Sequence, residues 1–217
     1  LEGYHDPIVW LDEFFSLIPE SDVDGIAVHC YMPNAGALKS YIQRFKKYNK
    51  PIWLTEFCAW EGNVTPESQQ KFMADAINYL EADPDIFRYA WFIPRWSGGE
   101  NEFPYMPLLK NSTTSQLTEL GKIFTQMSTQ DNSIYYVEQQ IIEAEHYSSI
   151  SITEIIGTDN WVNGPRVRLT TESPNKSLEL YNFLPGQWVE YQVEIDRNKE
   201  FDLEIRYASF MDSDISI

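Results

Sequence analysis

The most informative stretch of this sequence for its architecture is Pro51-Ile52-Trp53-Leu54-Thr55-Glu56-Phe57. Its apolar and β-branched residues are typical of a strand buried inside a parallel sheet, and we place Trp53 in the core. The stretch carries one carboxylate, Glu56, close to its end. Because burying a charge without a compensating partner is costly, Glu56 is the first candidate for a functional residue.

Two further predicted strands, at residues 25–31 and 86–92, have the same composition. Apolar residues at helical spacing lie before, between and after the three strands. The predicted helices cover residues 8–18, 37–48, 66–80 and 115–127. Thr65 can cap the third helix, with Pro66 at its first position. This alternation predicts an α/β fold with a parallel sheet, either a barrel or an open sheet. The absence of a glycine-rich phosphate loop weakens the nucleotide-binding version.

The sequence pattern changes after residue 128. Residues 187–195 and 201–207 alternate apolar with polar side chains, and turns are predicted at 184–186 and 196–199. Short alternating strands with turns between them are typical of an antiparallel sandwich. We therefore expect an α/β domain, a linker and an all-β domain at residues 1–127, 128–134 and 135–217.

The composition excludes some classes of partner. A net charge of −17 argues against nucleic acid and against anionic membrane surfaces, because both require a positive patch. No apolar run approaches the ~18 residues of a membrane span. Two cysteines, Cys30 and Cys58, form neither a disulfide framework nor a zinc pattern. Aromatic residues make up 15% of the chain, which suits a protein that binds a neutral polysaccharide.

The ends of the three predicted strands carry the candidate site residues. In a parallel barrel, functional groups lie at the C-terminal ends of the strands. His29 and Tyr31 end the first strand, Glu56 the second and Trp91 the third, so all four would meet at one rim. Simpler interpretations stay open. Glu56 could face solvent or pair with Arg95, His29 could be a hydrogen-bonded core histidine, and Trp91 could fill the barrel.

Several segments in the same order resemble glycoside hydrolase family 128. Residues 24–31, 51–57, 89–92 and 117–121 look like its strands six, seven and eight and its closing helix, and Trp10-Leu11-Asp12-Glu13-Phe14 is similar to the helix before strand six. The resemblance covers roughly residues 8–125. It implies the C-terminal portion of a (β/α)8 barrel that hydrolyses β-1,3-glucan with retention of configuration.

The resemblance also implies roles for individual residues. Glu56 would be the nucleophile, and His29, Tyr31 and Trp91 would contact the substrate. Retaining hydrolysis requires a second carboxyl group about 5–5.5 Å away as acid/base. In the family this glutamate lies on strand four, which is absent from this chain, so we expect these 217 residues alone to be inactive.

The surroundings of the cleft give two further expectations. Cys30 stands where the family usually has a larger aromatic residue, which alters the local wall of the cleft. Trp60 and Trp96, on the loops above the rim, could line outer sugar subsites or could simply pack within their loops.

Residues 135–217 resemble the start of a family 6 carbohydrate-binding module, a jelly-roll sandwich. The resemblance rests on Ile142-Glu143-Ala144-Glu145 and on Gly186-Gln187-Trp188-Val189-Glu190-Tyr191. It implies a structural calcium ion bound by Glu143 and Glu145, whose oxygen ligands suit that ion. Alternatively, both are solvated strand glutamates. Trp161 is the best candidate for a sugar-binding aromatic residue of this module.

These expectations describe a secreted, retaining endo-β-1,3-glucanase that needs no cofactor for catalysis and acts on laminarin- or curdlan-type polysaccharide or oligosaccharide. Two alternatives remain at this point. One is a non-catalytic glucan-binding protein, and the other is a barrel hydrolase for another β-linked polysaccharide.

Overall fold

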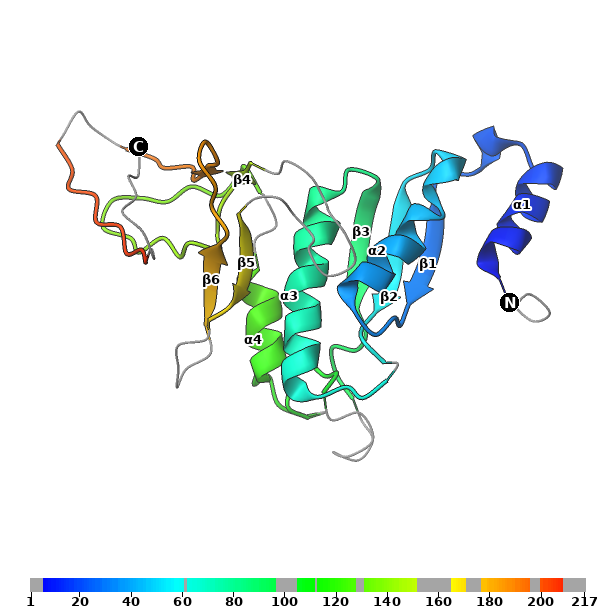
Figure 1. The fold of residues 1–217 in the computed structure, drawn as a ribbon, viewed down its shortest axis with the longest axis horizontal. Coiled ribbons are helices and arrows are strands. Elements are labelled where there is room, and N and C mark those ends of the chain that lie inside the picture. The colour runs from blue at the N-terminus through cyan, green and yellow to red at the C-terminus, as the bar shows by residue number, and fades with distance from the viewer. Residues whose placement is uncertain are drawn as a thin grey trace.

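The computed structural model of the chain describes residues 6–60, 62–96, 105–111, 113–127, 131–151, 165–170, 177–195 and 200–208 (Figure 1). Its α-helices are α1 (Pro7–Leu17), α2 (Ala35–Gln43), α3 (Pro66–Ala82) and α4 (Glu119–Gln126), with short 3-10 helices at Glu20–Asp22 and Lys46–Tyr48. Its strands are β1 (Ile26–Cys30), β2 (Ile52–Phe57), β3 (Ile86–Trp91), β4 (Ser149–Ile150), β5 (Arg166–Leu169), β6 (Leu178–Tyr181) and β7 (Val189–Glu190).

Strands β1, β2 and β3 form one parallel sheet in the order β1-β2-β3. Helix α2 connects the first pair of strands and α3 connects the second pair. This arrangement confirms the predicted α/β alternation, and consecutive parallel neighbours are compatible with part of a barrel. Among the described residues, no helix combines the length and the apolar character needed to cross a membrane.

Local sequence signals determine where α3 and α4 begin. The Thr65 hydroxyl accepts from the Ser68 amide, and the Ser68 hydroxyl accepts from the Thr65 amide, which completes a capping box before Pro66. Helix α4 begins at Glu119 with Thr118 as its cap, later than the predicted start at residue 115. The reason is that the chain just before Thr118 forms a β-bridge with the preceding loop, which competes with helix formation.

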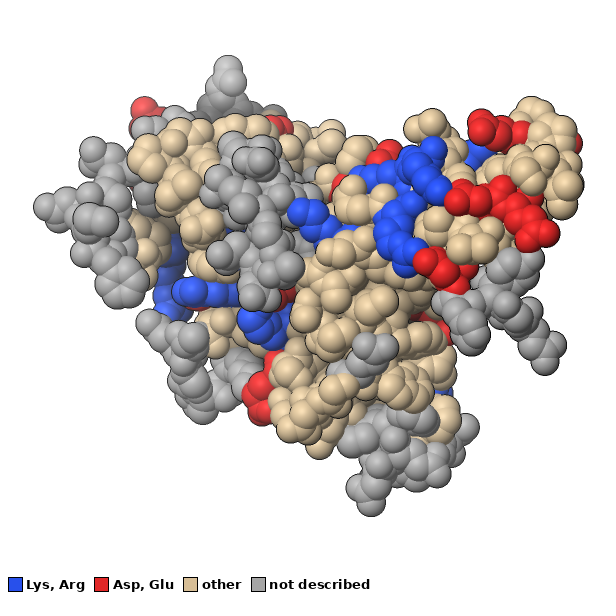
Figure 2. Space-filling model, turned by 45° about the vertical axis from the view of Figure 1, so that its right-hand side comes forward, with Lys and Arg blue, Asp and Glu red and all other residues tan. Residues whose placement is uncertain are grey.

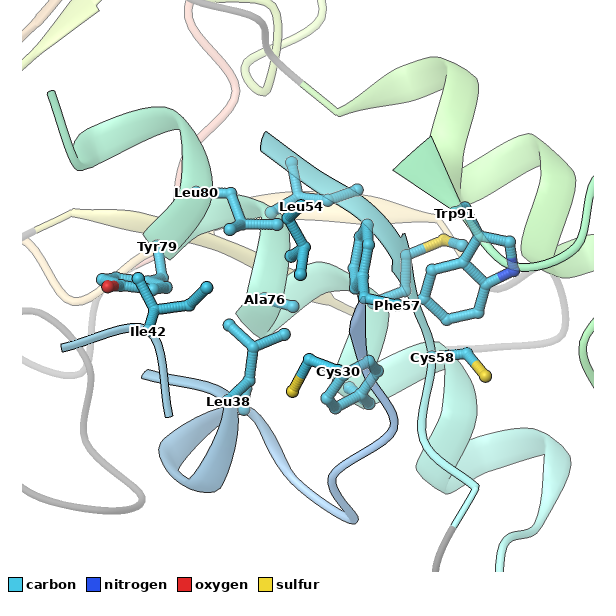
Figure 3. Packing of buried hydrophobic residues seen from close by; sticks show 14 of the residues in the cluster. Cys30, Leu38, Ile42, Leu54, Phe57, Cys58, Ala76, Tyr79, Leu80 and Trp91 are labelled. Carbon is cyan, nitrogen blue, oxygen red and sulfur yellow. The ribbon is translucent and has the colours of Figure 1, made fainter. Parts of the chain in front are cut away.

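The core lies between one face of the parallel sheet and helices α2 and α3. Figure 3 shows Leu54 and Phe57 of β2 directed toward Ala76 of α3 and Leu38 of α2. All four side chains are fully buried in the structure. The burial of these apolar groups is the main stabilising contribution to this part of the fold.

The other face of the sheet is open, and Trp53 lies on it. Our expectation that Trp53 belongs to the core is wrong, because 37% of this residue is exposed. Its ring packs on Phe87 at 4.8 Å, and the Arg88 guanidinium lies 6.0 Å from its centre. The cause is strand alternation, which turns Trp53 away from its buried neighbours Ile52 and Leu54.

The basic region at the end of α2 is neutralised by carboxylates. Arg44 pairs with Asp6 at 2.5 Å, and Lys47 pairs with Asp12 of α1 at 2.6 Å. Figure 2 shows blue Lys and Arg side chains next to red Asp and Glu side chains on one face of the molecule. The pairs connect α1 and its N-cap Asp6 to the end of α2 and to the 3-10 helix that follows it.

The second part of the chain contains two antiparallel strand pairs, β4–β7 and β5–β6. The turn predicted at residues 184–186 is present, because the Gln187 amide donates to the Leu184 carbonyl across Pro185 and a Gly186 with φ of 84°. The alternating pattern overestimates strand content. Only Val189–Glu190 of the predicted strand 187–195 is β-strand, and residues 200–208 contain none.

This second part packs directly against the outer side of α3. The buried Asn78 side chain of α3 donates to the Val167 carbonyl of β5 at 2.9 Å and accepts from the Val167 amide at 3.2 Å. Val167 and Leu178 are buried in a cluster continuous with the core of the parallel sheet. The side-chain amide therefore supplies both hydrogen bonds that the buried backbone of β5 needs at this position.

Candidate active site

A shift in strand register brings Glu56 to the open face of the sheet. Strand β1 pairs with β2 as Val28↔Leu54 and then as His29↔Glu56, so Thr55 is the extra residue. Regular alternation would have placed Glu56 on the same face as the buried Leu54. Because a bulge of one residue reverses which face the next side chain occupies, Glu56 comes to lie beside His29.

Two side chains hold the Glu56 carboxylate through the same oxygen. The Tyr31 hydroxyl donates a short hydrogen bond to Oε2, and His29 Nδ1 lies 3.2 Å from this atom. The described residues provide no hydrogen bond to Oε1 of Glu56. The Glu56 side chain is 34% exposed, so the carboxylate is accessible to a ligand.

The electrostatic environment keeps Tyr31 protonated. Burial raises the pKa of the Tyr31 phenol well above its ordinary value, and the hydrogen bond to the Glu56 carboxylate raises it further. The hydroxyl is therefore a hydrogen-bond donor at every working pH.

Tyr31, which binds this carboxylate, belongs to a cluster of three aromatic rings. Tyr31 contacts Trp60 and Phe92 edge to face, with ring centres 5.6 and 5.5 Å apart. Trp60 and Phe92 lie 6.1 Å from each other at an interplanar angle of 34°. With 42% of Trp60 exposed, the cluster presents an apolar ring surface next to Glu56, of the kind that suits a pyranose face. Phe92 was not among the residues predicted for the site, although alternation at the end of β3 could have indicated it.

The structure does not bring Trp91 to this site. Trp91 is 5% exposed, and its ring packs on Phe57 at 5.1 Å and on Phe72 of α3 at 6.0 Å. Its indole N–H donates to the Met106 carbonyl at 2.8 Å. Trp91 therefore fills the core, and its neighbour Phe92 packs instead on Tyr31 beside Glu56, because adjacent strand residues point to opposite faces.

The structure does not pair Glu56 with Arg95. Arg95, its proposed simple partner, instead donates to the carbonyls of Asn111 and Thr114, each at 2.8 Å. Trp96 is half-buried in the same loop. Trp161 lies outside the described residues.

The predicted calcium ligands differ in their surroundings. Glu143 is exposed, whereas Glu145 is buried, and burial raises the pKa of the Glu145 carboxyl. Within the described part of the chain, no group of three or more His, Cys, Asp or Glu residues could hold a metal ion. Glu143 and Glu145 would supply two of the six to eight oxygen ligands that calcium takes, so the calcium site stays a prediction that requires further ligands.

Residues 2–124 match the family model described as the glycosyl hydrolase catalytic core. The chain belongs to this family. A curated relative of this catalytic core, alkali-sensitive linkage protein 1 of Schizosaccharomyces pombe, is 32% identical over 119 residues, which are 53% of this chain and 22% of the yeast protein.

Solved structures similar to this catalytic core include two β-1,3-glucanases. One is a GH128 subgroup II endo-β-1,3-glucanase from Pseudomonas viridiflava, with 32% identity over 56% of this chain and 49% of that chain and a TM-score of 0.47. The other is a GH128 subgroup I endo-β-1,3-glucanase from Amycolatopsis mediterranei, a glutamate-to-glutamine mutant in complex with laminarihexaose. It has 26% identity over 53% of this chain and 50% of that chain, with a TM-score of 0.45. The chain thus spans about half of each glucanase.

Proposed function

We propose that this chain supplies the nucleophile and part of the substrate cleft of a β-1,3-glucan hydrolase. The observation that carries the proposal is the environment of Glu56, whose Oε2 binds the Tyr31 hydroxyl and lies 3.2 Å from His29 Nδ1 while 34% of the side chain stays exposed. A carboxylate fixed through one oxygen keeps the other aligned for attack. Membership of the glycosyl hydrolase catalytic core family supports the same assignment.

The proposed reaction retains the configuration of the sugar in two displacements. Oε1 of Glu56 forms a bond to the anomeric carbon while the glycosidic C–O bond breaks, and a carboxylic acid protonates the departing oxygen. We place this acid in the strand-four segment that the family resemblance implies. Water then attacks the glycosyl-enzyme, and the acid that gave up its proton in the first displacement now acts as the base. Tyr31, a neutral donor, stabilises the ionised carboxylate before attack and after its release.

The substrate assignment rests on the ordered family 128 motifs in residues 8–125 together with the ring cluster beside Glu56. Trp60 and Phe92 would contact sugar rings, while Tyr31 links them to the carboxylate. A laminarin- or curdlan-type β-1,3-glucan is the proposed polymer, and internal cleavage is the proposed mode of action.

The same proposal extends to the parts of the architecture that surround the site. The three-stranded sheet would belong to a (β/α)8 barrel, with its open face directed inward. Residues 135–217 would begin a jelly-roll carbohydrate-binding module, which the antiparallel pairs β4–β7 and β5–β6 support. The protein would act outside the cell, where such glucans occur as polymers.

The test is Glu56→Gln in the full-length protein, assayed on laminarin and on curdlan. The variant keeps the size and hydrogen-bond acceptance of the side chain but loses the nucleophile, so activity should fall by several orders of magnitude. Glu119→Gln is the matched control, because Glu119 is an exposed carboxylate in the first turn of α4. It should behave as the parent protein does.

More than about a tenth of parental activity in Glu56→Gln, a barrier change below about 1.4 kcal/mol, would remove Glu56 from this role. A parent protein that binds laminarin without cleaving it would favour a non-catalytic glucan-binding protein. Cleavage of mannan in preference to laminarin would contradict the proposed substrate.

A further inference from the structure

A buried glutamine of α3 holds the loop that follows the candidate nucleophile. Gln69 is fully buried, and its side chain donates from Nε2 to the Ala59 carbonyl at 2.9 Å. The Gln69 side-chain oxygen accepts from the Ala59 amide at 3.0 Å. One side chain thus satisfies both polar backbone groups of a residue that is itself only 1% exposed.

The position of Ala59 explains why its two hydrogen bonds with Gln69 matter for the site. Ala59 lies three residues after Glu56 and directly before Trp60, so it joins the carboxylate to the exposed ring. The loop is also tied at its start, where the Cys58 amide donates to the Cys30 carbonyl at 3.3 Å. Ala59 is the last buried residue before the chain emerges at Trp60, which is 42% exposed.

We propose that Gln69 is a positioning residue that sets the place of Trp60 against Tyr31 and Phe92, and through it the affinity for sugar rings. The inference rests on the proposed function, since it assigns Trp60 to the substrate cleft. It does not require Gln69 to touch the substrate.

The chemistry of a primary amide explains why this residue type stands here. An amide donates and accepts at once, as the backbone of a neighbouring strand would. An apolar replacement would leave the N–H and C=O of Ala59 buried without partners, and each unsatisfied group is costly. The loop would then move to solvate them, and Trp60, the next residue, would move with it.

The chain offers a matched control on the same helix. Asn78 binds the backbone of Val167 with the same two-point arrangement, but on the side of α3 that faces β5. Gln69→Leu and Asn78→Leu each remove one buried amide from α3 and leave one backbone position without its two partners. Only the first of them lies next to the site.

The first experiment reports on Trp60 without any substrate. The full-length protein is labelled with 5-fluorotryptophan, and Trp60→Phe assigns the fluorine resonance of Trp60. In Gln69→Leu this resonance should shift or broaden, whereas in Asn78→Leu it should stay in place. An unchanged Trp60 resonance in Gln69→Leu, or an equal change in both variants, overturns the proposal whatever the protein hydrolyses.

The second experiment measures kinetics on laminarihexaose. Gln69→Leu should raise KM about tenfold, which corresponds to about 1.4 kcal/mol of binding free energy, with a much smaller change in kcat. Asn78→Leu should leave KM within about twofold. Equal changes in KM and kcat for both variants would reflect general destabilisation and would overturn the positioning role. A parent protein without activity on any β-1,3-glucan would refute the proposed function, and the fluorine experiment would still decide the role of Gln69.

The conservative variant Gln69→Glu adds a readout that depends on pH. Burial disfavours the charged form and raises the pKa of a carboxyl group, and only the protonated acid can both donate and accept like the amide. Activity of Gln69→Glu relative to the parent should therefore rise as the pH falls from 8 to 5. A ratio that does not change with pH would overturn the proposal.

Discussion

Replacing Trp91 with alanine should destabilise the protein strongly, because the structure places this ring in the core and not in the cleft. Trp91 is 5% exposed, and its indole packs on both Phe57 and Phe72. An aromatic side chain of this size buries roughly 200 Å², which at about 25 cal/mol per Å² corresponds to about 5 kcal/mol. Measured truncations of this kind cost about 3–5 kcal/mol.

A second contribution comes from the lost indole donor. The Met106 carbonyl accepts from Trp91 Nε1 at 2.8 Å, and losing a buried partner costs about 1–3 kcal/mol. We expect a total of about 4 kcal/mol after the neighbours relax. For a cooperative unfolding unit of about 150–250 residues each kcal/mol lowers the Tm by about 2–4 °C, which predicts a drop of roughly 8–16 °C.

The assay is thermal unfolding of the full-length protein followed by circular dichroism, together with the affinity for laminarihexaose below the transition. Trp91→Phe is the control, since it keeps an aromatic ring in the core and should lose a smaller part of the stability. Phe92→Ala is the converse variant and should weaken oligosaccharide binding with little change in Tm. If Trp91→Ala unfolds within about 3 °C of the parent but loses oligosaccharide binding, the ring is a sugar platform and the reasoning is refuted.

Three other perturbations test separate parts of the structure. Tyr31→Phe should lower kcat/KM about 10- to 100-fold with little change in Tm, because a hydrogen bond to a charged group contributes about 1.5–3 kcal/mol. Activity equal to that of the parent would exclude Tyr31 from the site. Burial raises the pKa of the Cys58 thiol to about 12, so the thiol stays protonated at pH 8. It should therefore react with a disulfide reagent only after unfolding. Rapid labelling of the native protein would contradict this burial. Calcium bound at Glu143 and Glu145, as the sequence proposes, should raise the Tm relative to chelator; identical unfolding curves of the full-length protein in both conditions would exclude the site.

Local sequence patterns were sufficient for the order and type of the elements in the first part of the chain. Apolar runs predicted β1, β2 and β3 to within two residues at each end, and Thr65 with Pro66 predicted the start of α3. Both kinds of signal depend on residues close together in the chain, so they can be recognised without the fold. The alternation after residue 128 was a less reliable signal of strands. An alternating segment becomes a strand only where a neighbouring strand pairs with it, and few such pairs form here.

The direction of the site side chains depended on the tertiary structure. Alternation alone places Glu56 in the core with Leu54, and only the register shift opposite His29 turns it outward. The burial of Trp91 and the placement of Phe92 beside Tyr31 also depend on strand register, because a shift of one residue along a strand changes the face that a side chain occupies.

The sequence also did not predict the hydrogen-bond partners of the buried side-chain amides. Gln69 binds Ala59 ten residues away, and Asn78 binds Val167 eighty-nine residues away. A glutamine or asparagine on a helix is usually a solvated residue, and nothing in its neighbours along the chain indicates burial. The sequence alone therefore determined the strands, the helices and the identity of the candidate carboxylate. The tertiary structure decided which face each side chain occupies and what holds it there, because register and long-range hydrogen bonds exist only once the chain is folded.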